Sequence, residues 1–130
     1  RPANAFVTGF LGNTEAFEGR IEKGAWHYEN YAWPLDTQRR WQEQTATAYI
    51  RPHEWQIDAG RPMLATVLAH IRHSGALVHL TLRLEDGRQI QADLPAAEAA
   101  RLNLQPGQTL PLAPRQIYVF GQSELIDYAI

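Results

Sequence analysis

Apolar and polar residues alternate in two runs in the second half of the chain, over residues 67–72 and 78–84. Alternation with a period of two is typical of a half-buried β-strand. Ser74-Gly75 lies between the runs, and a two-residue turn there brings apolar residues opposite one another on one face. A slip of one residue would turn that face to solvent, so the pattern predicts a β-hairpin. Its expected pairs are Ile71 with Val78, Ala69 with Leu80 and Val67 with Leu82.

A second turn follows at Glu85-Asp86-Gly87. As a three-residue loop with Gly87 in the left-handed conformation, it keeps the next apolar residues on the same face as the hairpin. A two-residue turn at Asp86-Gly87 would instead oppose Leu84 to Gln89, so the longer loop is favoured. Its expected pairs are Leu82 with Ile90, Leu80 with Ala92 and Val78 with Leu94.

Apolar spacing, β-branched content and turn residues predict the remaining elements. Helices are expected over residues 5–11 and 96–104. The expected strands are two short ones within 16–34, with turns at Lys23-Gly24 and Glu29-Asn30, one over 45–50 that ends before Pro52, and closing strands over 109–112 and 116–120. Residues 36–44 and 58–62 are expected to be loops. Short strands, close turns and one helix inserted before the last strands predict an all-β fold, a small barrel rather than a sandwich.

Composition narrows the class of protein. The 130 residues fit one domain, and 45% apolar with 20% charged residues is typical of a globular chain. The net charge of −2 disfavours a dedicated nucleic-acid binder, and no apolar run is long enough to cross a membrane. The absence of cysteine excludes disulfides and thiolate metal sites. Because the chain starts at Arg1 and its sole methionine is Met63, we expect a piece of a longer protein without a secretory leader.

The motifs of several enzyme classes are missing. The single lysine, Lys23, precedes a glycine, so the chain holds no phosphate-binding G-x-x-x-x-G-K-S/T loop. It also lacks the G-x-G-x-x-G, G-x-S-x-G and H-E-x-x-H patterns. Serine occurs only at Ser74 and Ser123, and the predicted turn explains the first. We therefore expect no catalytic residues.

Two histidines suggest a metal site. In the predicted register His70 and His79 lie directly opposite each other on the outer face, close enough to share a zinc ion or a proton. A solvated barrel face explains them equally simply, and no third ligand is in evident reach. The solvated face is the favoured interpretation.

The hairpin tip suggests an anion site. Arg72, His73 and Ser74 could hold an oxyanion through charge and backbone N–H groups, with Arg83 as a more distant candidate. Turn formation alone would also place these residue types there. We therefore treat anion binding by these four residues as a hypothesis.

Four tryptophans occur in the first half of the chain. They lie near Arg39 and Arg40, and aromatic residues interleaved with arginines can bind single-stranded nucleic acid on a barrel face. Packing in the core and at its rim is the favoured interpretation, given the negative net charge. The residues are Trp26, Trp33, Trp41 and Trp55.

Three stretches of the sequence resemble the ATPase subunits of bacterial ABC importers. "PANAFVTGFLGN" resembles the end of their nucleotide-binding domain, "YIRPHEWQI" the R-P strand of the regulatory domain that follows, and "RQIYVFG" the strand that ends that domain. "FEGRIEKGAWHYENYAWPL" resembles the opening hairpin of the sulfate/thiosulfate subunit. The resemblance covers essentially the whole chain and favours sulfate/thiosulfate over the maltose, glycerol phosphate, iron and molybdate relatives.

The resemblance implies an OB-fold-like barrel, the transport-associated or TOBE-type domain. Residues 1–13 would be the remnant of the C-terminal helix of the upstream nucleotide-binding domain, 14–121 the barrel and 122–130 a tail. It implies a non-catalytic regulatory domain that forms a homodimer and reaches membrane permease subunits through the parent ATPase. ATP and Mg would bind in the missing upstream domain, and no cofactor in this fragment.

The resemblance also implies a cytoplasmic location, peripheral to the inner membrane, with no membrane insertion and no nucleic acid. Its alternative is an oxyanion-binding sensor module of the same barrel type, for sulfate or molybdate. Arg72, His73, Ser74 and Arg83 would be the candidate ligands.

Overall fold

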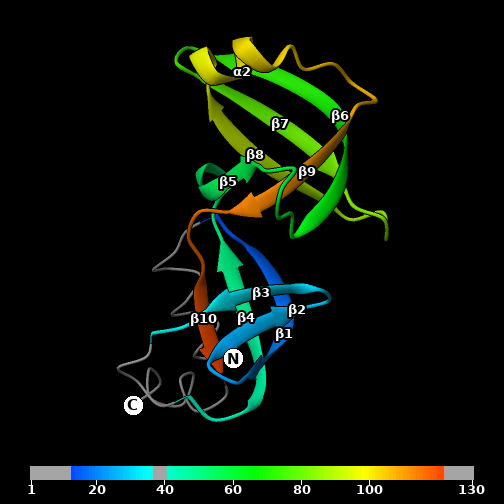
Figure 1. Ribbon diagram of the computed structural model, residues 1–130. Coiled ribbons are helices and arrows are strands. Elements are labelled where there is room, and N and C mark those ends of the chain that lie inside the picture. The colour runs from blue at the N-terminus through cyan, green and yellow to red at the C-terminus, as the bar shows by residue number, and fades with distance from the viewer. Residues whose placement is uncertain (1–12, 37–40, 122–130) are drawn as a thin grey trace. The chain divides into compact units, whose positions relative to one another are not determined.

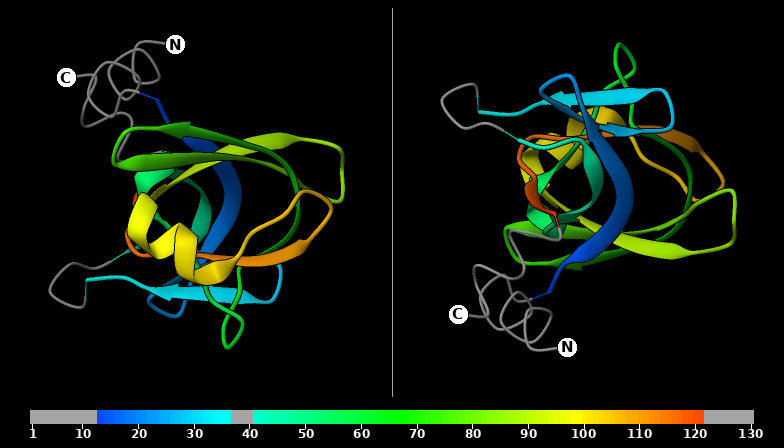
Figure 2. Two further views of the ribbon diagram at one scale, coloured as in Figure 1. Left: turned by 90° about the horizontal axis from the view of Figure 1, so that it is seen from above. Right: turned by 90° about the horizontal axis from the view of Figure 1, so that it is seen from below.

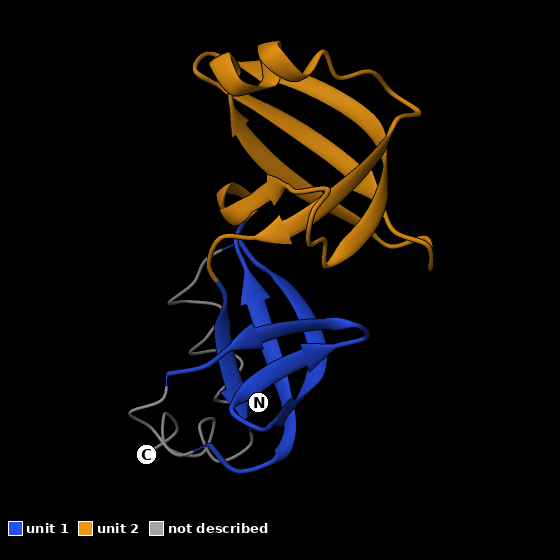
Figure 3. Cartoon of the chain, viewed as in Figure 1, with its two compact units in different colours: residues 1–51, 117–130 blue, residues 52–116 orange. Residues whose placement is uncertain are grey.

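The computed structural model describes residues 13–36 and 41–121, which form two compact units. Unit 1 comprises residues 1–51 and 117–130, and unit 2 comprises residues 52–116 (Figure 3). The range 14–121, which the resemblance assigns to a single barrel, thus contains parts of both units. The expected helix over 5–11 and the tail lie outside the described residues.

Unit 1 is built on an antiparallel sheet with the strand order β10-β4-β1-β2-β3 (Figure 1). The strands are β1 (Glu15–Glu22), β2 (Ala25–Tyr28), β3 (Tyr31–Pro34), β4 (Gln44–Ile50) and β10 (Tyr118–Gly121). Residues 16–34 form three strands rather than two, because turns at Lys23-Gly24 and Glu29-Asn30 each reverse the chain. Lys23 and Gly24 have φ values of 52° and 75°, the left-handed conformation that a tight hairpin turn requires.

The main core of unit 1 lies on one face of this sheet, and Phe120 packs with Tyr49 and Tyr118 on the other. Trp26 is fully buried in the main core, and its indole Nε1 donates a hydrogen bond of 3.0 Å to the carbonyl oxygen of Ala46. The Trp26 ring stacks on Tyr28, with 5.9 Å between the ring centroids, and Tyr28 meets Phe17 edge to face. Gly19 lies inside β1. Its missing side chain leaves the space that the Trp26 indole fills.

Substitution of Gly19 by alanine is expected to destabilise unit 1 by about 1–3 kcal/mol, the usual cost of overpacking a filled core. An added Cβ would collide with the backbone oxygen of His27 and would lie 2.8 Å from the indole Nε1 of Trp26. Moving the backbone at His27 to relieve this collision costs more free energy than moving the end of a flexible side chain would. Urea unfolding, followed through the amide signals of β1 and β4, measures the loss.

Gly60→Ala is a control for the substitution itself, and because Gly60 lies in unit 2 its effect is read from the amide signals of that unit. A Cβ at Gly60 would meet only the Asp58 carboxylate, at 3.4 Å, and we expect a change within about 0.5 kcal/mol. Equal losses of unfolding free energy for the Gly19 and Gly60 variants would contradict the steric argument.

Unit 2 is a curved antiparallel sheet with the order β5-β9-β6-β7-β8. Its elements are η1 (Pro52–Glu54), β5 (Trp55–Ile57), β6 (Leu64–Ser74), β7 (Leu77–Arg83), β8 (Gln89–Pro95), α2 (Ala96–Leu102) and β9 (Thr109–Pro114). The two outer strands, β5 and β8, contact each other, so the sheet closes into a small barrel. The left view of Figure 2 looks onto α2, which lies over one end of the curved sheet. The all-β barrel expected from the sequence is confirmed, whereas the three-residue strand β5 was not predicted.

The predicted register of the first hairpin is wrong. The turn consists of Gly75 and Ala76 rather than Ser74 and Gly75, so Ile71 lies opposite Leu80. A β-bulge between Leu68 and His70 also interrupts the alternation along β6. Before the bulge Thr66 and Leu68 face the core, and Val67 does not. The residues of β7 expected in the core are buried, namely Val78, Leu80 and Leu82.

The predicted register of the second hairpin is confirmed. Leu82 pairs with Ile90, and Gly87 closes the three-residue loop with a φ of 89°. The N–H of Leu84 donates to the carbonyl of Arg88 across this loop, at 2.8 Å. The predicted helix is present as α2. It ends two residues earlier than expected because Asn103 adopts the left-handed conformation, with φ 53° and ψ 54°.

Candidate functional site

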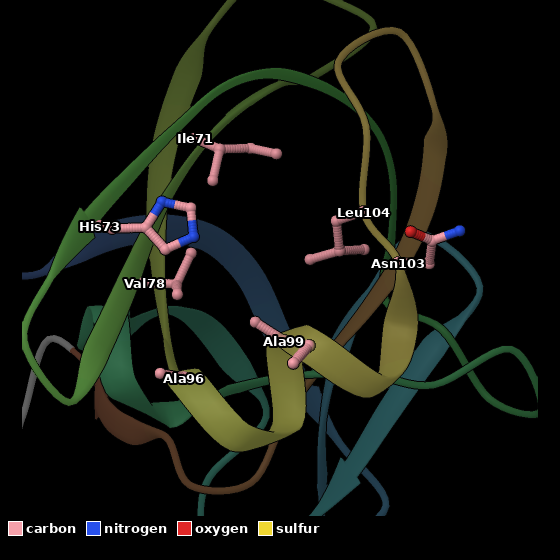
Figure 4. Close-up of a pocket in the computed structure, with 8 residues that line it drawn as sticks. Ile71, His73, Val78, Ala96, Ala99, Asn103 and Leu104 are labelled. Carbon is pink, nitrogen blue, oxygen red and sulfur yellow. The ribbon is translucent and has the colours of Figure 1, made fainter.

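A pocket of about 330 Å³ opens in unit 2 between α2 and the end of the β6–β7 hairpin (Figure 4). Most of the side chains that line it are apolar. They are Ile71, His73, Val78, Ala96, Ala99, Ala100, Asn103 and Leu104.

Local sequence explains how α2 comes to form one wall. Pro95 lies at the end of β8 and precedes the first turn of the helix, where the N–H of Ala96 donates to the carbonyl of Ala76 in the hairpin turn, at 2.8 Å. This bond ties the start of α2 to the tip of β6–β7. The helix presents alanine side chains to the barrel, and Ala99 is buried against it. Small side chains on the helix leave open space next to the strands.

His73 is the only titratable side chain among the residues that line the pocket. It pairs with Val78, whose side chain is buried, so both lie on the inner face of the hairpin. Figure 4 shows the imidazole directed toward the space beside Ile71 and Val78. Sequence reasoning selected His73 but not its apolar surroundings, because these depend on how α2 packs.

The four candidate anion ligands are not brought together. Arg72 pairs with His79 and Ser74 with Leu77, so both lie on the opposite face of the hairpin from His73. Arg83 shares that outer face but lies four residues farther along β7 than the partner of Arg72, roughly 13 Å at the rise of a β-strand. The anion site at these residues stays a prediction, without a converging geometry to support it.

The predicted pairing of His70 with His79 is wrong. The shifted hairpin turn places His70 opposite Thr81, and His79 opposite Arg72. Within the part of the chain that the structure describes, no group of three or more metal-ligating side chains occurs.

His79 instead belongs to a polar cluster on the outer face of β7 and β8. Its Nδ1 lies 2.7 Å from Oδ1 of Asp93, and both side chains are about 15% exposed. Gln91 Nε2 donates to the same carboxylate oxygen at 2.8 Å. An N–H at His79 Nδ1 can donate to this carboxylate oxygen. The cluster thus links side chains across β7 and β8.

Two of the four tryptophans are core residues. Trp26 and Trp55 are fully buried, which confirms the packing interpretation for these two. Trp33 lies opposite Trp26 on β3 and is half-buried, as is Trp41. Arg39 and Arg40 lie outside the described residues.

Comparison with known protein families assigns the chain to a class of protein. Residues 16–57 match the family model described as the CysA C-terminal regulatory domain, and residues 58–115 match that of the TOBE-like domain. The chain is 53% identical, over its whole length, to the sulfate/thiosulfate import ATP-binding protein CysA of Neisseria meningitidis serogroup B, and covers 37% of that protein. The protein of the same name from Bordetella pertussis is 34% identical over 93% of the chain, which covers 35% of it.

A solved structure supports the fold. The cytoplasmic molybdate-binding protein ModG, with molybdate bound, superposes with a TM-score of 0.59 at 15% identity, over 81% of this chain and 94% of ModG. This likeness confirms the expected OB-like class of all-β domain. The chain belongs to the family of CysA C-terminal regulatory domains with a TOBE-like part. It spans little more than a third of the length of the CysA relatives.

Among the residues that the structure describes, no helix has the length and apolar character needed for a membrane span.

Proposed function

We propose that this chain is the regulatory domain of the ATP-binding subunit of a sulfate or thiosulfate ABC importer, and that it acts through contact between subunits. The observation that carries the proposal is the 53% identity over the whole chain to a protein named for sulfate/thiosulfate import. The match to the CysA C-terminal regulatory model supports the same assignment.

ATP binding and hydrolysis would take place in the rest of the parent subunit. This chain has no phosphate-binding loop, so ATP and Mg would be held elsewhere. The parent would form a homodimer, contact membrane permease subunits and work at the cytoplasmic side of the inner membrane. In that assembly the regulatory domain stabilises the dimer.

A chimera tests the assignment. The region of the Neisseria meningitidis protein that aligns with this chain is replaced by residues 1–130, in a strain that depends on that subunit for growth on sulfate. We expect growth close to that of the unmodified subunit, because the two regions align end to end. A chimera that accumulates as folded protein but supports no growth would overturn the assignment. The same chimera with Gly19→Ala should grow less, because its regulatory domain is destabilised.

Association of the chain with itself is tested separately. Light scattering over a concentration series is expected to show a rise in mass toward that of a dimer. A chain that stays monomeric at the highest concentration would count against subunit contact through this domain. ATP hydrolysis by the isolated chain is expected to be absent.

The oxyanion-sensor alternative stays a prediction. ModG holds molybdate, but at 15% identity the likeness carries the fold alone to this chain. Calorimetric titration with sulfate, thiosulfate and molybdate tests it. Heat of binding that is lost on substitution of Arg72 would favour a sensor over a purely structural regulatory domain.

A further inference from the structure

We propose that the pocket beside α2 binds a small organic carboxylate, with its branched aliphatic body in the pocket and its carboxylate at His73. This goes beyond the proposed regulatory function and does not depend on it. The pocket is formed entirely by residues 71–104, all within unit 2.

The size of the pocket fits a small ligand. Its volume of about 330 Å³ is at the lower end of the range typical of small-molecule sites. Such sites combine apolar walls with a few polar groups that orient the ligand. Here Ile71, Val78 and Leu104 supply branched apolar walls, and α2 adds only alanines. The pocket is open on one side, so the aliphatic body of a small ligand would lie against its walls and keep part of its surface in solvent.

The lining disfavours a bare inorganic anion. Sulfate or molybdate would need charged groups or N–H donors on several sides to replace its water shell. His73 is the only ionisable lining residue, and Asn103 is the only other lining residue with a polar side chain. An apolar body with a single charged end satisfies both parts of this surface.

His73 provides the contact for that charged end. Its ring is exposed at the mouth of the pocket, and the structure gives it no hydrogen bond to another described side chain or backbone group. The ring is directed at the pocket in Figure 4. An imidazole N–H can donate to a carboxylate, and the bond is charge-assisted when the ring is protonated.

Amide NMR titration of the chain tests the proposal, with 4-methylpentanoate as the probe. So small a ligand is expected to bind with a dissociation constant of about 1 mM, so the titration runs to about 20 mM. We expect saturable shifts at residues that line the pocket. The neutral 4-methylpentanamide should bind roughly tenfold more weakly at a pH where imidazole is protonated. His73→Gln should remove that difference.

Matched variants distinguish binding in the pocket from binding elsewhere on the surface. His70→Gln changes an exposed histidine on the same strand that faces away from the pocket, and should bind as the unmodified chain does. Ala100→Leu fills the pocket and should abolish binding. The amide spectrum without ligand establishes that this variant is folded, and Ala96→Leu serves if it is not.

Three results would overturn the proposal. The first is the absence of saturable shifts up to the highest probe concentration. The second is equal binding of the carboxylate and the amide by the unmodified chain. The third is sulfate producing the same shifts at the same residues, which would assign the pocket to inorganic oxyanions.

Discussion

Substitution of Trp26 by alanine is expected to lower the free energy of unfolding of unit 1 by about 3–5 kcal/mol. Trp26 is fully buried, so the change leaves a large cavity in the sheet's packed face. It also removes the hydrogen bond from the indole Nε1 to the carbonyl of Ala46, and the stacked contact with Tyr28. Urea unfolding followed through the amide signals of β1, β2 and β4 gives the loss.

Two further variants separate the contributions of burial and of the indole hydrogen bond to the effect of Trp26→Ala. Trp33→Ala removes the same ring from the half-buried position directly opposite, and should cost clearly less. Trp26→Phe keeps an aromatic ring but loses the donor, and should cost about 1–2 kcal/mol. Similar losses for Trp26→Ala and Trp33→Ala would contradict the assignment of Trp26 as the central core residue of unit 1.

Leu80→Ala is expected to destabilise unit 2 by about 2–5 kcal/mol. Leu80 is fully buried on β7, opposite Ile71 on β6 and Ala92 on β8, so it packs at the middle of the three-strand part of the barrel. The truncated side chain leaves a cavity that neighbouring strands cannot close, because their register is held by backbone hydrogen bonds. The amide signals of β6, β7 and β8 report the change in urea.

Leu77→Ala is the matched control for Leu80. It makes the same substitution on the same strand, but at a side chain that is 39% exposed. We expect a loss below about 1 kcal/mol, because little apolar surface leaves the core. If both leucine variants lose the same stability, the barrel interior is not where the structure places it.

The two hairpins differ in how far the sequence could predict them. Between β7 and β8 alternation is unbroken, and Gly87 alone can adopt the left-handed conformation cheaply, so pattern and turn agree. Along β6 the bulge near Ala69 shifts the alternation by one residue. No residue type marks that bulge, because it arises where β6 stops pairing with β9 and continues alone with β7. The register of the β6–β7 hairpin therefore depends on which strands pair in the folded unit, and the local sequence pattern does not specify it.

The candidate site could be predicted only in part. His73 was selected as a potential ligand because of its residue type at a hairpin tip, and the structure places it at a pocket. Its neighbours in space are Ile71, Val78 and the alanines of α2 rather than Arg72 or Ser74. Strand parity separates adjacent residues onto opposite faces, so closeness in sequence is a poor guide to a shared site in a β-strand. The position of the helix could not be inferred from its own sequence.

Unit 1 draws its strands from both ends of the described chain, since β10 pairs with β4 across the whole of unit 2 in sequence. On the ribosome, residues 52–116 can therefore complete their barrel while the first sheet still lacks its last strand. Until β10 is made, β4 has an open edge that could pair with another chain. A polypeptide that stops at residue 116 would keep that edge permanently, and premature termination here should yield an aggregating product rather than a shorter soluble one.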